Sequence, residues 1–116
     1  MAKHIKTGRK GEELARQYLA ERGYLILELN WRYRHWEVDI IASKNNILHF
    51  IEIKTKQSNK YGFPEETVSV KKIKNLIGAA EIYLYRHPEW QRIQFDILSI
   101  TLTPELEYFL IEDVYL

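Results

Sequence analysis

Apolar residues recur along the chain with two different periods, and the period changes from one segment to the next. Spacings of three and four residues, which are typical of amphipathic helices, predict helices over residues 8–22 and 70–86. Shorter alternating or continuous apolar runs predict strands over residues 24–29, 36–42, 47–54, 92–101 and 106–115. The predicted order is therefore helix, three strands, helix, strand and one appended strand.

Each predicted helix has a face that we expect to be buried. On the first helix, which should end at Gly23, this face comprises Gly11, Leu14, Ala15, Tyr18 and Leu19. On the second helix, which Ser69 can cap, it comprises Ile73, Leu76, Ile77, Ala80 and Leu84.

The order of the elements predicts how they connect. Three consecutive strands can form an antiparallel meander, and the second helix can cross over to place the fourth strand parallel to the third in the usual right-handed sense. The predicted fold class is α/β or α+β, with a mixed central sheet flanked by helices. Without repeats or a Pro/Gly-rich linker, residues 1–116 are expected to form a single domain.

Asn45 and Asn46 lie between the second and third predicted strands and tolerate positive φ, so they predict a two-residue hairpin turn. Residue numbers of paired positions then sum to 91, which places Asp39 opposite Glu52 and Glu37 opposite Lys54. Because side chains alternate along a strand, all four charged side chains share one face. The sequence therefore predicts a polar pocket at one end of an otherwise apolar layer.

Two opposed carboxylates repel each other, and each raises the pKa of the other. A divalent cation such as Mg²⁺ or Mn²⁺ relieves the repulsion, since Mg²⁺ commonly binds one or two carboxylates together with water and phosphate. With Lys54 orienting water or neutralising charge on phosphate, this set of groups suits hydrolysis of a phosphodiester. The alternative is a buried ion-pair cluster in which Lys54 balances Glu37 and Glu52.

Composition adds to this picture mainly through the distribution of charge. The chain has a net charge of +1, but residues 1–74 contain 15 Lys or Arg and 9 Asp or Glu, a net of +6, whereas residues 75–116 contain 2 and 7, a net of −5. This asymmetry favours a polyanionic partner, although ordinary solvated charge explains it equally well. Absence of cysteine is compatible with a cytoplasmic protein, and we expect no membrane span or signal peptide.

Further charged side chains are candidates for assisting the pocket or binding phosphate. Glu12 lies at the margin of the apolar stripe of the first helix and could reach the pocket edge, or it could simply favour the helix dipole. Seven basic residues can contact a phosphate backbone: Arg32, Arg34, Lys56, Lys60, Lys71, Lys72 and Lys74. Tyr33, Tyr61 and Phe63 lie nearby and can stack on bases, although packing is the more common role of such rings.

The segments "GEELARQYLAERGY", "NWR", "WEVDII", "FIEIKTK", "FPEETVSVKKIKNLIGAAEIYL" and "FDI" occur in this order within residues 8–98. In this respect the chain resembles the YraN-like family of small, uncharacterised bacterial proteins. That family is assigned to the PD-(D/E)xK nuclease superfamily, which implies a restriction-endonuclease-like αβββαβ core similar to that of archaeal Holliday junction resolvases.

The resemblance implies a role for each matching position. Asp39 and Glu52 match the two metal-binding acids, Lys54 matches the lysine, and the backbone carbonyl of Ile53 would complete the metal shell. Glu12 matches an acid on the first helix, and Lys72 matches a lysine on the second. Glu37 is either an outer-shell acid or the partner of Lys54. Two positions depart from the family: Trp36, which could narrow access to the pocket, replaces a common Gly, and Gln94 replaces a common Arg before Phe95 and Asp96.

Three hypotheses about function follow. The first is a Mg²⁺- or Mn²⁺-dependent nuclease that acts on DNA, including branched or otherwise structured DNA. The second is a non-catalytic nucleic-acid-binding module that retains the nuclease fold and acts with partners in DNA repair or recombination. The third is a structural protein with a buried salt-bridge cluster. A homodimer through the aromatic-rich C-terminal strand is compatible with the sequence, as is a covered sheet edge.

Overall fold

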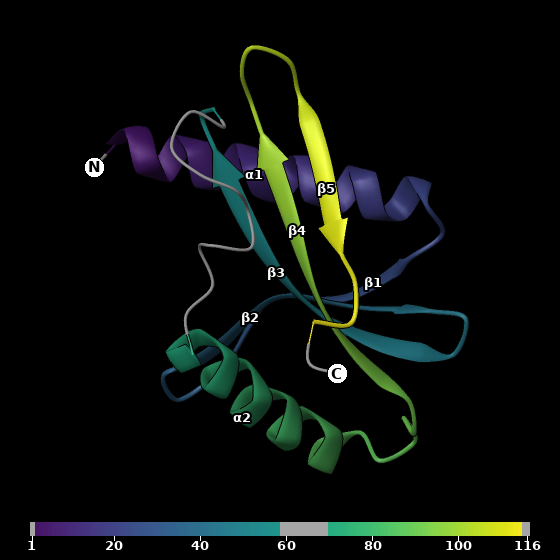
Figure 1. The fold of residues 1–116 in the computed structure, drawn as a ribbon. Coiled ribbons are helices and arrows are strands. Elements are labelled where there is room, and N and C mark those ends of the chain that lie inside the picture. The colour runs from purple at the N-terminus through teal and green to yellow at the C-terminus, as the bar shows by residue number, and fades with distance from the viewer. Residues whose placement is uncertain (1, 59–69, 115–116) are drawn as a thin grey trace.

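The computed structural model describes residues 2–58 and 70–114, which form five strands and two helices (Figure 1). Within these residues, neither helix is long and apolar enough to cross a membrane. The elements are α1 (Ala2–Glu21), β1 (Leu25–Tyr33), β2 (Trp36–Lys44), β3 (Ile47–Lys56), α2 (Val70–Arg86), β4 (Ile93–Thr101) and β5 (Glu107–Ile111).

The five strands form one mixed sheet in the order β1-β2-β3-β4-β5. The first three strands are antiparallel, β4 runs parallel to β3, and β5 returns antiparallel to β4. The predicted meander and the crossover through α2 are thus confirmed. This mixed α+β arrangement, a five-stranded sheet flanked by two helices, is compatible with a restriction-endonuclease-like αβββαβ core.

The turn between β2 and β3 has the predicted form. Asn45 and Asn46 have φ values of 53° and 63°, as a type I′ hairpin turn requires. The ladder pairs residues whose numbers sum to 91, from Lys44 with Ile47 to Ile40 with Ile51, which confirms the predicted register. The ladder stops there, so Asp39 with Glu52, and Glu37 with Lys54, are not ladder pairs.

The helices agree with prediction except at one end. The bounds of α2 match the predicted residues 70–86, but α1 begins at Ala2 rather than at residue 8. The predicted start is wrong because nothing in residues 2–7 breaks a helix. At the other end Gly23 has a φ of 89°, and the amide of Tyr24 donates to the carbonyl of Leu19 over 3.0 Å. This 6→1 bond is that of a Schellman cap.

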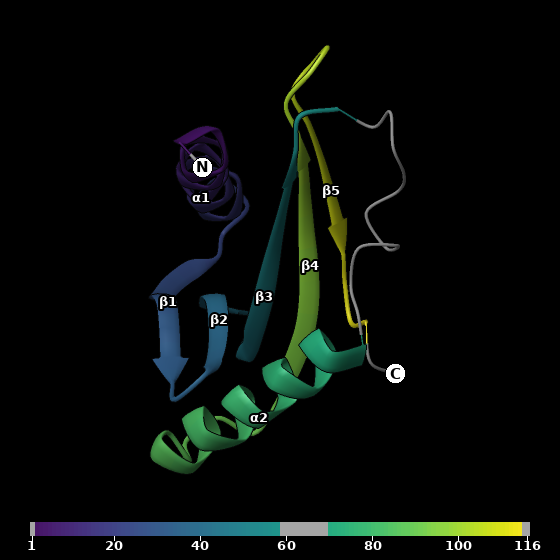
Figure 2. The same ribbon diagram turned by 90° about the vertical axis from the view of Figure 1, so that its left-hand side faces the viewer.

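The two helices cover different faces of the sheet (Figures 1 and 2). Neighbouring residues of a strand point to opposite faces, and their packing divides accordingly. The α1 face buries Ala15, Leu19, Tyr24, Ile40, Ala42, Ile51, Leu98 and Ile100. The α2 face buries Val38, Ile41, Leu48, Phe50, Leu76, Ala79, Ala80 and Tyr83. Burial of Ile77 was a wrong prediction: its side chain is 37% exposed, because the buried stripe of α2 runs through Ala79 and Tyr83 instead.

Two glycines allow each helix to approach the sheet closely. A Cβ atom on Gly11 of α1 would lie 2.0 Å from Oγ1 of Thr55 on β3. A Cβ atom on Gly78 of α2 would lie 2.9 Å from the indole ring of Trp36 on β2. Trp36, which the sequence left unexplained, therefore packs flat against α2 where a larger residue would not fit.

Candidate functional site

A polar cavity of about 300 Å³ lies between the β1–β2 hairpin, the charged ends of β2 and β3, and the first turns of α2. Seven residues line it: His35, Glu37, Asp39, Glu52, Lys72, Asn75 and Leu76. Three of these side chains are carboxylates that we predicted to share one face. Ile41 and Phe50, the apolar neighbours of these charges on the same face of β2 and β3, pack against α2. The apolar layer thus ends in a charged cavity.

Asp39 is the first acid of this cavity. Its Oδ2 atom accepts a hydrogen bond from the backbone amide of Ile53 over 2.8 Å. Burial and, after it, the neighbouring Glu52 together raise the pKa of Asp39 to about 7, while the hydrogen bond from the Ile53 amide opposes the shift. The neutral and ionised forms of Asp39 are therefore both populated near neutral pH, as expected where two acids lie close together.

The same hydrogen bond bears on the backbone of Ile53. In an antiparallel pair, the N–H and C=O of one residue point to the same neighbouring strand. The Ile53 amide points to Asp39, so its carbonyl is expected to face β2 as well. This orientation favours the predicted contribution of that carbonyl to a metal shell.

Glu52, the second acid, has two ammonium groups as partners. Nζ of Lys72 on α2 lies 2.7 Å from Oε1 of Glu52, and Nζ of Lys54 on β3 lies 3.9 Å from the same oxygen. Burial lowers the pKa of Lys54, and the adjacent Lys72 lowers it further. Partial burial opposes the charge on Lys72, but Glu52 outweighs this effect and the pKa of Lys72 is raised.

The structure contradicts one of the two roles predicted for Glu37, the pairing with Lys54. Its Oε2 atom accepts a hydrogen bond from Arg32 over 3.0 Å, across the β1–β2 ladder. The predicted pairing with Lys54 is wrong, because β2 and β3 no longer pair at that level and β1 supplies the nearer cation. Glu37 still lines the cavity, so its role as an outer acid stays a prediction.

Glu12 lies on α1, which packs on the opposite face of the sheet. It is half-buried and follows Gly11, which contacts Thr55 near the end of β3. Glu12 is not among the described residues that line the cavity. Its assisting role stays a prediction.

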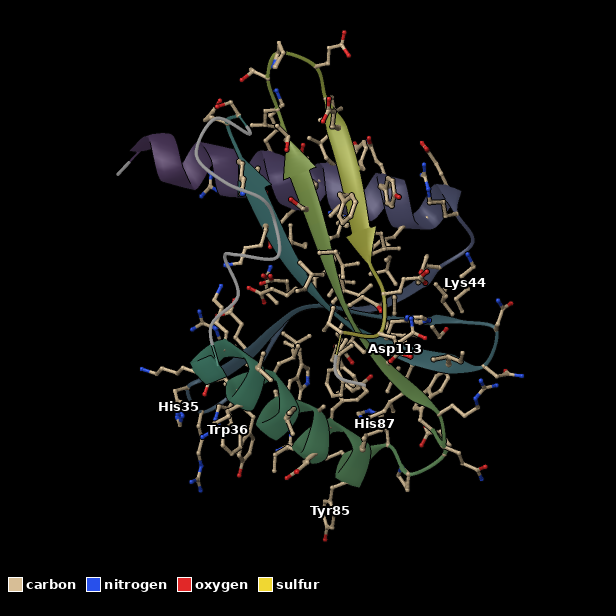
Figure 3. The ribbon with its side chains drawn as sticks, viewed as in Figure 1. His35, Trp36, Lys44, Tyr85, His87 and Asp113 are labelled. Carbon is tan, nitrogen blue, oxygen red and sulfur yellow. The ribbon has the colours of Figure 1, made fainter. Side chains whose placement is uncertain are left out.

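The predicted basic residues flank the cavity on two sides. Arg32 and Arg34 are exposed on the β1–β2 hairpin, and Lys71 and Lys74 are exposed beside Lys72 on the first turns of α2. Figure 3 shows His35 and Trp36 of the hairpin beside α2. Lys56 lies at the end of β3. Lys60, Tyr61 and Phe63 lie outside the residues that the structure describes.

Several contacts near the hairpin were not foreseen. The guanidinium groups of Arg34 and Arg86 lie 5.4 and 5.2 Å from the ring centre of Tyr33, which stacks on Trp36 at 6.1 Å. Tyr33 is thus a packed ring with two cation–π partners. Only the position of Tyr33 beside Arg34 was visible in the sequence, since Arg86 comes from the far end of α2.

The donor atoms of the cavity can be compared with those that metal ions require. Across residues 2–58 and 70–114, no group of three or more His, Asp or Glu side chains is placed to hold a metal ion. Asp39 and Glu52 nevertheless supply the one or two carboxylates that Mg²⁺ uses alongside water and phosphate. Burial and the neighbouring Glu52 raise the pKa of Asp39, and a cation held between the two acids would offset both effects. The residues therefore fit Mg²⁺ or Mn²⁺, which take oxygen ligands.

Comparison with a family model and with individual proteins indicates the same family. The family described as "Uncharacterised protein family UPF0102" matches residues 11–100. A UPF0102 protein of Cytophaga hutchinsonii is 46% identical over 99 residues, which cover 84% of this chain and 87% of the relative. One from Flavobacterium johnsoniae is 43% identical over 104 residues, covering 86% and 85%. One from Phocaeicola vulgatus is 40% identical over 114 residues, covering 98% and 93%.

Proposed function

The chain belongs to the UPF0102, or YraN-like, family, and from its cavity we propose that it is a metal-dependent nuclease that hydrolyses phosphodiester bonds in DNA. The observation that carries the proposal is the meeting of Asp39 and Glu52, two acids from neighbouring strands, at a cavity beside two lysines. Their positions match the acids and the lysine of the PD-(D/E)xK pattern.

In this proposal Asp39, Glu52 and the carbonyl of Ile53 would hold Mg²⁺ or Mn²⁺. When bound, the cation would supply Lewis-acid chemistry that activates water and offsets the charge on the phosphate. Asp39 binds a cation in its ionised form, so its raised pKa means that protons compete with the cation increasingly as the pH falls below about 7.

Lys54 has the second role. Its side chain is 20% exposed, and its ammonium group lies beside Glu52, where it can orient the attacking water and neutralise charge on the phosphate. Its lowered pKa brings proton exchange nearer to neutral pH. Hydrolysis forms a new P–O bond from water and breaks the ester bond to the leaving strand, whose oxygen takes up a proton.

The basic residues on both sides of the cavity would position the DNA backbone. The exposed Arg34 on one side and the exposed Lys71 and Lys74 on the other leave the acidic cavity between two positive borders. Contacts with phosphate of this kind give affinity but no sequence preference. This arrangement is compatible with duplex, single-stranded and branched DNA.

Cleavage by the purified protein tests the proposal directly. Linear duplex, single-stranded and four-way-junction DNA are each incubated with Mg²⁺, with Mn²⁺ or with EDTA. We expect cleavage of at least one substrate that requires the cation and is lost in Asp39→Asn and in Lys54→Met. Glu81→Gln, an exposed acid on α2, serves as the matched control. Equal cleavage by Asp39→Asn and wild type would exclude the assignment of the site.

A second candidate function is a non-catalytic module that binds nucleic acid through the same surface. Pairing of Lys72 with Glu52 favours it, because the protein already compensates one acid without a metal ion. Binding would then persist in EDTA, weaken steeply with salt, and be accompanied by no cleavage of any of the three substrates. An anisotropy titration of labelled DNA in EDTA distinguishes this function from the nuclease.

A further inference from the structure

Lys72 occupies an unusual place for a lysine that was predicted to bind DNA. Its ammonium group points into the cavity and lies 2.7 Å from Oε1 of Glu52, a distance typical of a charge-assisted hydrogen bond. Lys54 lies 3.9 Å from the same oxygen, so one carboxylate oxygen faces two positive groups. Glu52 is thus the best-compensated acid of the cavity.

We infer that Lys72 is an internal counter-cation of Glu52, which a divalent cation displaces and which then binds phosphate of the DNA strand. This inference rests on the proposed function and concerns regulation of the same site. It assigns Lys72 two successive partners, Glu52 before the cation binds and DNA afterwards.

Repulsion between positive charges explains why a divalent cation would displace Lys72 from Glu52. A divalent cation held by Glu52 would share its ligand oxygen with the ammonium group of Lys72. Two positive charges would then lie side by side in a half-buried cavity, where solvent screens them poorly. One of them must leave, and the carboxylate is held in place by β3.

Lys72 is the group that can leave. Its side chain is 46% exposed, whereas that of Lys54 is 20% exposed. A lysine side chain is long and flexible, and its ammonium group is strongly hydrated, so moving outward toward solvent costs little. Its outward path lies beside Lys71 and Lys74, which are exposed on the same turns of α2. After displacement, three lysines would face the DNA backbone from this helix.

A consequence is that the cation and DNA strengthen each other's binding. In EDTA, Lys72 is held by Glu52 and contributes little to DNA affinity. With the cation bound, Lys72 adds one phosphate contact, which should steepen the salt dependence of binding by about one contact. Reciprocity requires that DNA raise the affinity for the cation by the same factor.

The test measures Mn²⁺ binding rather than activity. Calorimetric titration of the metal-free full chain with Mn²⁺ compares wild type, Lys72→Met and the matched control Lys71→Met, which removes an equal charge one residue away. We expect Lys72→Met to bind Mn²⁺ about tenfold more tightly than wild type and Lys71→Met to differ by less than about twofold. Equal or weaker binding of Mn²⁺ by Lys72→Met would overturn the inference.

A second measurement tests whether Lys72 contacts DNA once the cation is bound. Anisotropy of a labelled phosphorothioate duplex, which resists cleavage, is followed against salt in EDTA and in Mn²⁺. Wild type should show the steeper salt dependence only in Mn²⁺, and Lys72→Met should show the same dependence in both. A steepening that persists in Lys72→Met would also overturn the inference.

Failure of this inference and failure of the proposed function are distinguishable. If wild type and Lys72→Met bind Mn²⁺ equally while wild type cleaves DNA, only the counter-cation role of Lys72 falls. If Lys72→Met binds Mn²⁺ more tightly but no substrate is cleaved, the displacement of Lys72 by the cation is supported and the proposed nuclease activity is contradicted. If neither protein binds Mn²⁺, both fall.

Discussion

Two aspartates on opposite faces of the same sheet differ in how completely their oxygens are bound. Asp96 on β4 is fully buried, and both of its oxygens have partners. Nδ1 of His49 lies 2.6 Å from Oδ2, while Gln94 Nε2 and the backbone amide of Asp113 each lie 2.9 Å from Oδ1. Asp96 therefore holds β3, β4 and the turn after β5 together.

Asp39 has the opposite surroundings. One oxygen accepts a backbone hydrogen bond from Ile53, and the neighbouring acid Glu52 raises the pKa of Asp39 after burial does. Asp39 also borders a cavity of about 300 Å³. A buried carboxylate with donors on both oxygens stabilises a fold, whereas one beside a second acid at a cavity is a candidate to bind a ligand. The comparison therefore separates a structural acid from a candidate functional one.

The largest expected effect is on stability when the structural acid is removed. Asp96→Ala leaves the buried His49 and two part-buried donors without their partner, so the free energy of unfolding should fall by about 3–5 kcal/mol. Urea unfolding followed by circular dichroism measures it, with Glu107→Ala, an exposed acid on β5, as the control. A loss below about 1 kcal/mol would contradict the structural role of Asp96.

The functional acid should behave in the opposite way. The folded pKa of Asp39 is about 7, above its ordinary value of 3.8, so the folded protein binds one more proton between these values. Stability of the metal-free protein should therefore fall as pH rises from about 4 to about 7, by at most about 1.4 kcal/mol per pH unit.

Replacing Asp39 tests this sign. Asp39→Asn removes the titration, and its gain over wild type should grow across that window, to at most about 4 kcal/mol at pH 8. Urea unfolding in EDTA at pH 4.5, 6 and 8 measures the gain, and Glu81→Gln is the matched control. Parallel pH profiles for Asp39→Asn and wild type would contradict the raised pKa.

A smaller effect is expected where the hairpin that borders the cavity rests on α2. Gly78→Ala would place a methyl group 2.9 Å from the ring of Trp36, and this overpacking should cost about 1–2 kcal/mol. A double-mutant cycle with Trp36→Leu should recover part of the loss, because the smaller side chain makes room for the methyl group. Additive losses would show that the Trp36 ring does not limit position 78.

The smallest effect should come from the ion pair of Arg32 with Glu37. The side chain of Arg32 is 70% exposed and that of Glu37 is 39% exposed, so solvent screens the pair. Arg32→Gln should change the free energy of unfolding by less than about 1 kcal/mol in urea unfolding. A loss of unfolding free energy as large as that of Asp96→Ala would contradict the comparison, because the exposed partner of Glu37 would then stabilise the fold as much as the buried partners of Asp96.

Local chemistry explains which parts of the fold were predictable. Three features could be predicted because each depends on the conformational preferences of residues adjacent in sequence. They are the turn at Asn45 and Asn46, the cap at Gly23 and the bounds of α2. The β2–β3 register follows from the turn, so the convergence of Asp39 and Glu52 on one face was predictable too. The continuation of that register to Glu37 and Lys54 was not, because the β2–β3 ladder ends at Ile40 and Ile51 and Arg32 of β1 binds Glu37.

Contacts between distant segments explain what was not predictable. His49 meets Asp96 only because β3 and β4 are parallel in a particular register, which no short-range signal in the sequence specifies. Lys72 reaches Glu52 only because α2 docks at one height over β3, and Gly78 sets that docking together with Trp36. The contacts of His49 with Asp96 and of Gly78 with Trp36 become apparent only when the elements are assembled.

The hydrogen bond from the amide of Asp113 to Asp96 also limits how far the chain can be truncated at its C-terminal end without loss of stability. The family match ends at residue 100, yet a buried carboxylate on β4 obtains a donor from position 113, and the amide of Val114 donates to the carbonyl of Phe95 over 2.9 Å. A chain shortened to the matched segment would leave Asp96 facing water through an opened edge. The end of the family match is therefore not the end of the folding unit, and shortened versions should be tested for stability before any loss of activity is assigned to the cavity.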